Sequence, residues 1–285
     1  MVQDYIDLTK PRITWLILMS TGVGFFFGAL NASWSWAVLI HTIIGTALIA
    51  SGTAALNQWW EREADKKMTR TELRPLAAER IGPTGAVVFA IVLSVAGFVE
   101  LWLGANLLTG LLGLFTLLTY LLIYTPMKQR TPHSTTVGAI PGAMPPLIGF
   151  AAAHGSLTSE AWILFAILFV WQFPHFYAIA WMYKDDYAKA GIKMLPVVDP
   201  TGEHTARQIL FYSLALIPIS VIPRYLGMSG NIYLAGALML GMMYFYSGVL
   251  VARHKTRADA RRVLLASIVY LPVLYMLMMA DRTSL

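Results

Sequence analysis

Long runs of apolar residues alternate with short polar segments along most of the chain. A helix needs about 20 apolar residues to cross the roughly 30 Å hydrocarbon core of a bilayer. Nine runs reach or approach this length, and the seventh is short and flanked by prolines. The pattern predicts an all-α, polytopic membrane protein whose nine transmembrane helices span residues 13–30, 36–56, 85–103, 107–124, 136–153, 161–182, 209–223, 232–251 and 263–280.

Positive charge supports this number of helices. If the nine runs cross the membrane in turn, 19 of the 21 Lys and Arg residues fall on one side, and only Arg224 and Arg282 fall on the other. Lys and Arg concentrate on the cytoplasmic side of membrane proteins. We therefore expect a cytoplasmic N-terminus and a C-terminus outside. The two longest connections, after the second and sixth runs, lie on the positive side and carry nine of the 15 acidic residues.

The composition agrees with a membrane protein and narrows its chemistry. The chain is 57% hydrophobic and 13% charged, with a mean hydropathy of +0.62. It contains no Cys, which excludes disulfides, thiolate catalysis and Cys-ligated metal sites. The net charge of +6 is explained by its one-sided distribution, so we expect contact with membrane lipid and not with nucleic acid. We expect one domain over residues 1–285.

A first polar cluster follows the second apolar run. Asn57, Glu61 and Asp65 are four residues apart, which places three oxygen-bearing side chains on one face of a helix. Mg²⁺ commonly binds one or two carboxylates together with the phosphates of its substrate. A salt-bridged helix end in water is the simpler alternative. The neighbouring bases that could hold phosphate oxygens are Arg62, Lys66, Lys67, Arg70 and Arg74.

A second cluster lies in and after the sixth run. Gln172, Pro174 and His175 interrupt the apolar sequence, and Asp185 and Asp186 follow its end. Polar groups at membrane depth are costly and usually face a cavity, although a single His is often only an interior residue with a satisfied partner. Two acidic clusters facing each other across a cavity would clamp a diphosphate between Mg²⁺ ions and basic side chains.

Five motifs resemble a known family. The segments NxxxExxxDKKMxRTxxRPL, YTPMKQRT, GAIPGAMPP, WQFPHFYAIA and DYxxAGIKMLPV stand in this order at the ends of these runs. Together they resemble the protohaem IX farnesyltransferases, or haem O synthases, a branch of the UbiA-type intramembrane prenyltransferases. The resemblance covers nearly the whole chain. It implies nine helices around a central cavity, in a bacterial cytoplasmic (inner) membrane.

The resemblance also implies roles for individual residues. Glu61 stands where the wider family more often has Asp, and Ala190 replaces the second acid of a spaced pair, so one or two Mg²⁺ ions fit the pattern. The implied sets are: Mg²⁺ ligands Asn57, Glu61, Asp65, Asp185 and Asp186; diphosphate contacts Arg70, Arg74, Lys128 and Lys193; the haem contact His175; and catalytic residues Asn57, Glu61, Asp65, Asp186 and His175. The residue pattern adds Arg62 and Lys67 of the first cluster to the diphosphate contacts, and Gln172, one turn from His175, to the haem contacts.

The activity implied by the resemblance is transfer of a farnesyl group from farnesyl diphosphate to a vinyl carbon of haem B, giving haem O. Haem A synthase or the assembly of terminal oxidases is implied downstream. One alternative is a prenyltransferase that acts on an aromatic acid in quinone synthesis. A second, of another class, is a small-molecule transporter, but a transporter carries its polar groups near the bilayer centre, whereas these gather at one end of the helices.

Overall fold

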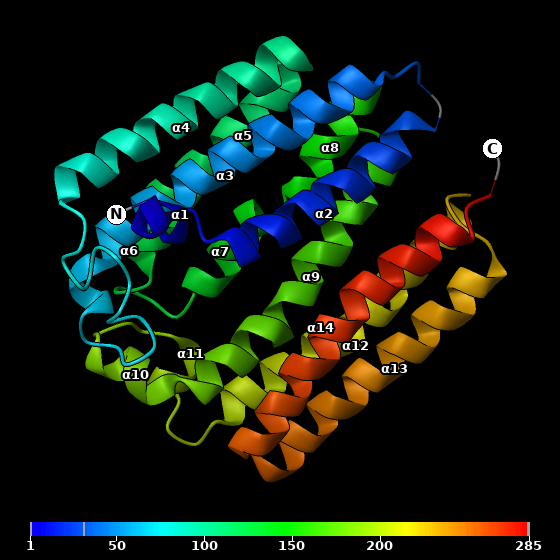
Figure 1. Ribbon diagram of the computed structural model, residues 1–285. Helices are drawn as coiled ribbons and strands as arrows, with labels where there is room; N and C mark the ends of the chain where they lie inside the picture. Colours follow the sequence, from blue (N-terminus) through cyan, green and yellow to red (C-terminus); the bar gives the residue numbers. More distant parts are fainter. Residues whose placement is uncertain (1, 31, 284–285) are drawn as a thin grey trace.

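The computed structural model describes residues 2–30 and 32–283, and every regular element among them is helical (Figure 1). Within these residues nine segments are long and apolar enough to cross a membrane, one for each predicted run. The all-α fold and the integral membrane character are thereby confirmed. The elements are α1 (Val2–Leu8), α2 (Pro11–Ala29), α3 (Trp36–Asp65), α4 (Pro83–Gly104), α5 (Leu107–Leu118), the π-helix η1 (Thr119–Tyr124), α6 (Thr125–Met127), α7 (Ser134–Gly142), α8 (Pro145–His154), α9 (Ser159–Met182), α10 (Lys184–Lys189), α11 (Leu195–Val198), α12 (Glu203–Tyr225), α13 (Asn231–His254) and α14 (Arg257–Ala280).

The long helices pack side by side in two groups. In the N-terminal half α2 packs against α8, and α3 packs against α4. In the C-terminal half α12 and α14 each pack against both α9 and α13, as Figure 1 shows. In this view α1 lies on the left of the molecule and the end of α14 on its right.

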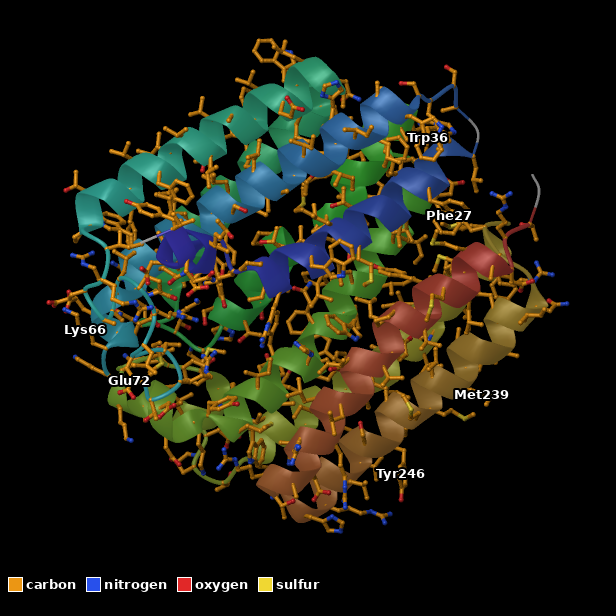
Figure 2. The ribbon with its side chains drawn as sticks, viewed as in Figure 1. Phe27, Trp36, Lys66, Glu72, Met239 and Tyr246 are labelled. Carbon is orange, nitrogen blue, oxygen red and sulfur yellow. The ribbon has the colours of Figure 1, made fainter. Side chains whose placement is uncertain are left out.

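The side chains distinguish the two ends of the molecule and its lipid-facing flank. Figure 2 shows Lys66 and Glu72 in the loop after α3, far from Trp36 at the beginning of that helix. We call the end with Lys66 and Glu72 the charged end. Met239 and Tyr246 point away from α13, and 69% and 63% of their surfaces are exposed. Such side chains fit the hydrocarbon of a bilayer.

Several predicted spans are longer in the structure than in the sequence pattern, most clearly the second, the seventh and the ninth. The ninth run is predicted at 263–280, and α14 begins at Arg257. The seventh run is predicted at 209–223, but α12 begins at Glu203. The first turns of this helix are polar, and the apolar pattern therefore does not include them. The second run was placed at 36–56, and α3 continues to Asp65. This extension carries the first polar cluster out of the apolar region as the last turns of one continuous helix.

Prolines interrupt two other spans. In the fourth, Pro126 has no N–H for the helical ladder, and the preceding residues form η1. The Tyr120 carbonyl accepts both the Thr125 backbone N–H and, at 2.8 Å, the Thr125 hydroxyl in this wider turn. The fifth span is divided into α7 and α8, and Pro145 begins the second helix. The break in the fifth span lies in the protein interior, where neighbouring groups can satisfy its backbone, whereas η1 exposes Leu122 and Ile123 on the outside of the molecule.

Glycines allow α2 and α8 to approach each other closely. A Cβ atom at Gly149 of α8 would overlap the backbone carbonyl of Thr21, and one at Gly24 of α2 would overlap that of Pro146. Small residues at such contacts are typical of membrane helices, whose association depends on close packing. By contrast, a Cβ atom at Gly22 of α2 would meet nothing within 4 Å.

We predict that Gly149→Ala lowers the stability of the detergent-solubilised protein by about 1–3 kcal/mol, because α2 and α8 must separate to admit the methyl group. Gly22→Ala is the matched control and should leave the melting temperature unchanged or slightly raised, since Ala is the better helix former. Thermal unfolding of both variants checks this. Equal melting temperatures would show that the α2–α8 contact is looser than described.

Candidate active site

A cavity of about 130 Å³ lies at the charged end, where α3, the loop after it, the end of α6 and α10 meet. Its wall combines charged groups with the rings of three tyrosines. The lining residues are Lys10, Asn57, Glu61, Asp65, Met68, Arg70, Arg74, Tyr120, Tyr124, Lys128, Tyr187, Ile192 and Met194. The sequence prediction that the first polar cluster and several bases share one site agrees with this arrangement.

The two carboxylates of the first cluster are each paired with a base from another part of the chain. Lys128 Nζ donates to Glu61 Oε1 at 2.7 Å. Arg74 Nη1 donates to both carboxylate oxygens of Asp65, at 2.9 and 2.8 Å. Only 1% of the Asp65 side chain is exposed, and burying a charge at this level requires a partner of opposite sign.

Lys10 supplies a third contact and was missed as a site residue by the sequence analysis. Its Nζ donates to Asn57 Oδ1 at 2.9 Å, so each oxygen-bearing residue along this face of α3 has its own base. In the sequence Lys10 is one of many positive residues flanking a span, and no spacing connects residues 10 and 57. We call the six residues the polar ladder: Lys10, Asn57, Glu61, Asp65, Arg74 and Lys128.

The backbone at Lys10 is in an unusual conformation. With φ 48° and ψ 62°, this residue lies in the left-handed region, immediately before Pro11. For a residue other than Gly, such a backbone conformation costs about 1–3 kcal/mol, so the surrounding structure must stabilise it. Here the Lys10 carbonyl accepts from the N–H groups of Ile13 and Thr14 in the first turn of α2, at 3.0 and 3.1 Å. The conformation places the ammonium group in the cavity wall.

The electrostatic environment of the two lysines differs. Burial, followed by the charge of Arg74, lowers the pKa of Lys10 to about 7. Burial by itself also lowers the pKa of Lys128, but the adjacent Glu61 carboxylate outweighs it, and the pKa of Lys128 lies well above its ordinary value. Lys128 is therefore a permanent cation of the site.

The π-helix places two tyrosine rings against the ladder. Lys128 Nζ lies 4.5 Å from the ring centroid of Tyr124 and 6.0 Å from that of Tyr120, distances at which the ring faces attract a cation. π-Helical turns are frequent at functional sites. The Pro126 in the YTPMKQRT segment was the one sequence signal for this local change.

Arg70 closes one side of the cavity. Its guanidinium lies over the rings of Tyr183 and Tyr187, 5.1 and 5.9 Å from their centroids, and its Nη2 donates to the Tyr187 hydroxyl at 3.3 Å. These contacts join the loop after α3 to α10. Tyr187 is a further residue of the site that the sequence analysis did not identify.

Three bases predicted to bind diphosphate do not line the cavity. Arg62 donates to the Trp59 carbonyl at 2.8 Å and lies over the ring of that residue. The side chain of Lys67 is exposed. Lys193 is also exposed, and only its backbone N–H approaches the site, donating to the Lys128 carbonyl at 2.7 Å. The structure therefore separates these three from Arg70, Arg74 and Lys128, which do line it.

The second acidic cluster is not joined to the first. Asp185 and Asp186 lie in α10, Asp185 exposed and Asp186 half-exposed, and neither lines the cavity that the next residue, Tyr187, helps to form. No group of three His, Asp or Glu side chains suited to a metal ion occurs among residues 2–30 and 32–283. Two facing acidic clusters, as the sequence suggested, are not present in this arrangement.

Gln172 and His175 have different surroundings on α9. Gln172 is buried, and its amide nitrogen donates to the carbonyls of Ala139 and Leu168 at 3.1 Å each. The first of these bonds connects α9 with α7 and the second stays within α9, so both N–H groups of Gln172 already have partners, and its contact with haem stays a prediction. His175 is half-buried, and its Nδ1 contacts the Ser267 hydroxyl at 2.7 Å.

The oxygen ligands of the ladder suit a single Mg²⁺ ion. Asn57, Glu61 and Asp65 present one amide and two carboxylate oxygens on one helix face toward one cavity. Magnesium prefers such hard oxygen ligands and is usually held by one or two carboxylates, with the remaining positions taken by water and substrate phosphates. The residues therefore fit a metal that shares its coordination with a phosphate-bearing ligand.

We predict that Lys128→Met destabilises the protein by about 3 kcal/mol, because it leaves the Glu61 carboxylate without its partner in a position where only 11% of that side chain is exposed. Adding Glu61→Gln to this variant should restore at least half of the loss, since the remaining amide needs no counter-charge. Denaturation of the single and double variants in detergent checks the coupling. Additive losses would contradict a direct pairing.

Comparisons with known proteins agree with this fold. Residues 17–271 match the model of the UbiA prenyltransferase family. A protein of Solibacter usitatus named protoheme IX farnesyltransferase is 64% identical, with all of both chains covered. Another of the same name, from Koribacter versatilis, is 45% identical over 99% of this chain and 94% of its own length.

Solved structures show the same fold at low sequence identity. A structure of digeranylgeranylglyceryl phosphate synthase superposes with a TM-score of 0.82 at 15% identity and covers 98% of each chain. A UbiA homologue from Archaeoglobus fulgidus, bound to GPP and Mg²⁺, gives a TM-score of 0.71 at 16% identity over 96% of this chain and 99% of that one. The chain belongs to the UbiA prenyltransferase family, in which its full-length relatives are protoheme IX farnesyltransferases.

Proposed function

We propose that this protein transfers the farnesyl group of farnesyl diphosphate to a vinyl carbon of haem B, with addition of water, and so makes haem O. The names of its relatives, up to 64% identical over the whole chain, support this assignment. The structural observation that carries it is the polar ladder, which combines three bases and three oxygen ligands around one cavity.

The reaction divides into bond breaking and bond making. The bond between the first farnesyl carbon and its diphosphate oxygen breaks, and the diphosphate leaves with the electron pair. The vinyl π electrons then form a bond to the farnesyl carbon, which leaves a positive charge on the other vinyl carbon. Water captures this cation and loses a proton, giving the hydroxyethylfarnesyl side chain of haem O.

The bases of the ladder would stabilise the leaving diphosphate. Arg74 and Lys128 have positions in the cavity wall from which they can turn from Asp65 and Glu61 to phosphate oxygens, and Lys10 can do so from Asn57. Cations held where charge develops lower the barrier to its departure. Mg²⁺, held by Asn57, Glu61 and Asp65, would neutralise part of the diphosphate charge and weaken the bond that breaks.

The tyrosine rings would stabilise the farnesyl cation that forms when the diphosphate leaves. Tyr120 and Tyr124 present π faces to the region next to Lys128, and such faces stabilise a nearby positive charge. The apolar faces of these rings would also limit the access of water to the cation. The site would thus favour carbon–carbon bond formation over simple hydrolysis of farnesyl diphosphate.

The proposed orientation brings both substrates to the site. We place the protein in a bacterial cytoplasmic membrane, with the N-terminus and the charged end facing the cytoplasm. The concentration of 19 Lys and Arg residues on that side supports this orientation. Diphosphate would then reach the ladder from the cytosol, while the farnesyl chain and the haem ring remain in or near the bilayer.

The proposal is tested by incubating the detergent-purified protein with haem B, farnesyl diphosphate and Mg²⁺ and by detecting haem O with mass spectrometry. We predict that Lys10→Met lowers kcat/KM for farnesyl diphosphate about 10- to 100-fold, because one hydrogen bond between charged groups is lost. Lys67→Met is the matched control, and it should retain wild-type kinetics because Lys67 lies away from the cavity.

Three outcomes would decide between explanations. Haem O formation that stops in EDTA supports both the reaction and the metal. Prenylation of an aromatic acid in place of haem would retain the diphosphate site and reject haem B as the acceptor. Equal losses in the Lys10 and Lys67 variants would reject the ladder as the diphosphate site, because the two lysines would then act only through total charge.

A further inference from the structure

A second cavity lies at the end of the molecule opposite the polar ladder. Its volume is about 100 Å³, which is enough for several water molecules or a small organic group. The ends of α2 and α8, the beginning of α9 and the loop after α12 surround it, so both helix groups contribute to its wall. Figure 2 shows Phe27 near Trp36 and far from Lys66 at the charged end. The apolar part of the wall includes Phe27, Phe150 and Met228, and its polar groups are His154, Thr158 and Glu160.

Glu160 brings a carboxylate into this wall without a basic partner. Its Oε2 accepts hydrogen bonds from the hydroxyls of Thr158 and Ser159, the latter at 3.2 Å. Within residues 2–30 and 32–283, Oε1 accepts no hydrogen bond, and no Lys or Arg forms an ion pair with the carboxylate. The N-terminus of α9 offers only a partial positive charge. A half-buried carboxylate in apolar surroundings is unfavourable unless a cation neutralises it.

Arg282 stands beside the same cavity, close to the C-terminal end of the chain. Its guanidinium carbon lies 5.4 Å from the ring centroid of Phe26, and that centroid is 5.2 Å from the ring centroid of Phe27 in the wall. The next residue, Thr283, donates its hydroxyl to the Gly227 carbonyl, in the loop that also forms part of the wall. Arg282 is exposed and forms no ion pair with an Asp or Glu in the part of the chain that the structure describes. The cavity thus has an unpaired anion in its wall and an unpaired cation beside it.

The cavity lies at the level where the spans leave the membrane. The first and fifth spans end at Ala29 and His154, and the sixth begins at Ser159. Trp34 and Trp36 are exposed at this end, as is typical of side chains at the boundary between hydrocarbon and head groups. The ligands available at this level therefore include the head groups of phospholipids.

We propose that this cavity binds the head group of a phosphatidylethanolamine from the membrane leaflet at this end. The ammonium group would donate to Oε1 of Glu160 and contact the rings of Phe27 and Phe150, since aromatic rings attract cations. The phosphate would lie at Arg282, whose guanidinium suits phosphate oxygens. A zwitterionic head group neutralises both unpaired charges at once, which neither a free anion nor a free cation does. Because the wall comes from both helix groups, the bound lipid would hold them together at this end.

The test measures lipid binding in the absence of haem and farnesyl diphosphate. Detergent-purified full-length protein is titrated by calorimetry with three short-chain phospholipids that differ only in the head group, which is ethanolamine, choline or glycerol. We expect the phosphatidylethanolamine to bind about tenfold more tightly than the phosphatidylcholine, because choline has no N–H to donate to Glu160. It should also raise the melting temperature of the protein.

Variants of two carboxylates at this end locate the site. Glu160→Gln should weaken binding of the phosphatidylethanolamine about tenfold and remove its advantage over the phosphatidylcholine. Glu100→Gln is the matched control, since Glu100 is also half-buried but lies outside the cavity, with its Oε1 2.7 Å from Nδ1 of His41. It should bind the lipid as the wild type does. Arg282→Gln should lower the affinity for all three lipids, because each carries the phosphate.

Four outcomes would overturn the proposal. Equal affinities of the wild type for the ethanolamine and choline lipids would reject recognition of the ammonium group, and this comparison needs no variant to fold. Tightest binding of the glycerol lipid would assign the site to an anion. Equal losses in Glu160→Gln and Glu100→Gln would reject the cavity as the binding site. Soluble phosphoethanolamine that binds as tightly as the lipid would reject a lipid occupant. Farnesyl transfer is measured separately, so its success or failure leaves each of these results unchanged.

Discussion

The charged end of this protein depends on how the last turns of α3 are neutralised. This helix carries Glu61 and Asp65 into a region where almost none of either carboxylate reaches solvent. Unpaired charges would be strongly unfavourable there. The bases that compensate them come from the loop after α3 and from the end of α6, and so the two ion pairs draw separate segments around one cavity. The geometry of the site follows from this requirement.

The same pairing suggests what the cavity binds. In the described structure the three bases of the ladder are occupied by protein oxygens, so an anion alone would have to displace a carboxylate and leave it unpaired. A ligand that brings an anion and a cation together avoids this problem. The bases of the ladder can then bind the anion while its carboxylates bind the cation. With Lys10 protonated, which an adjacent diphosphate favours, the ladder has one positive charge in excess. A prenyl diphosphate of about −3 with one Mg²⁺ has a net charge near −1. The sum is close to neutral, which favours burial of the whole assembly.

The sequence was sufficient for the features that depend on local pattern. Apolar length and one-sided positive charge predicted the nine spans, and four-residue spacing predicted that Asn57, Glu61 and Asp65 share a helix face. The residues of the cavity wall that the sequence did not indicate depend on tertiary structure. Lys10 reaches the site through a left-handed backbone conformation, and Tyr187 reaches it through α10. Arg62 and Lys67 belong to the same basic segment as Arg74, but their side chains do not line the cavity.

The central claim is that metal and diphosphate bind to the ladder as one unit, and linkage tests it most directly. The affinity of farnesyl thiodiphosphate, a slowly reacting analogue, is measured by calorimetry on haem-free protein with and without Mg²⁺. We expect Mg²⁺ to tighten analogue binding at least tenfold, which corresponds to about 1.4 kcal/mol, and the analogue to tighten Mg²⁺ binding by the same factor. Equal analogue affinity in Mg²⁺ and in EDTA would contradict the exchange of partners on which this account rests.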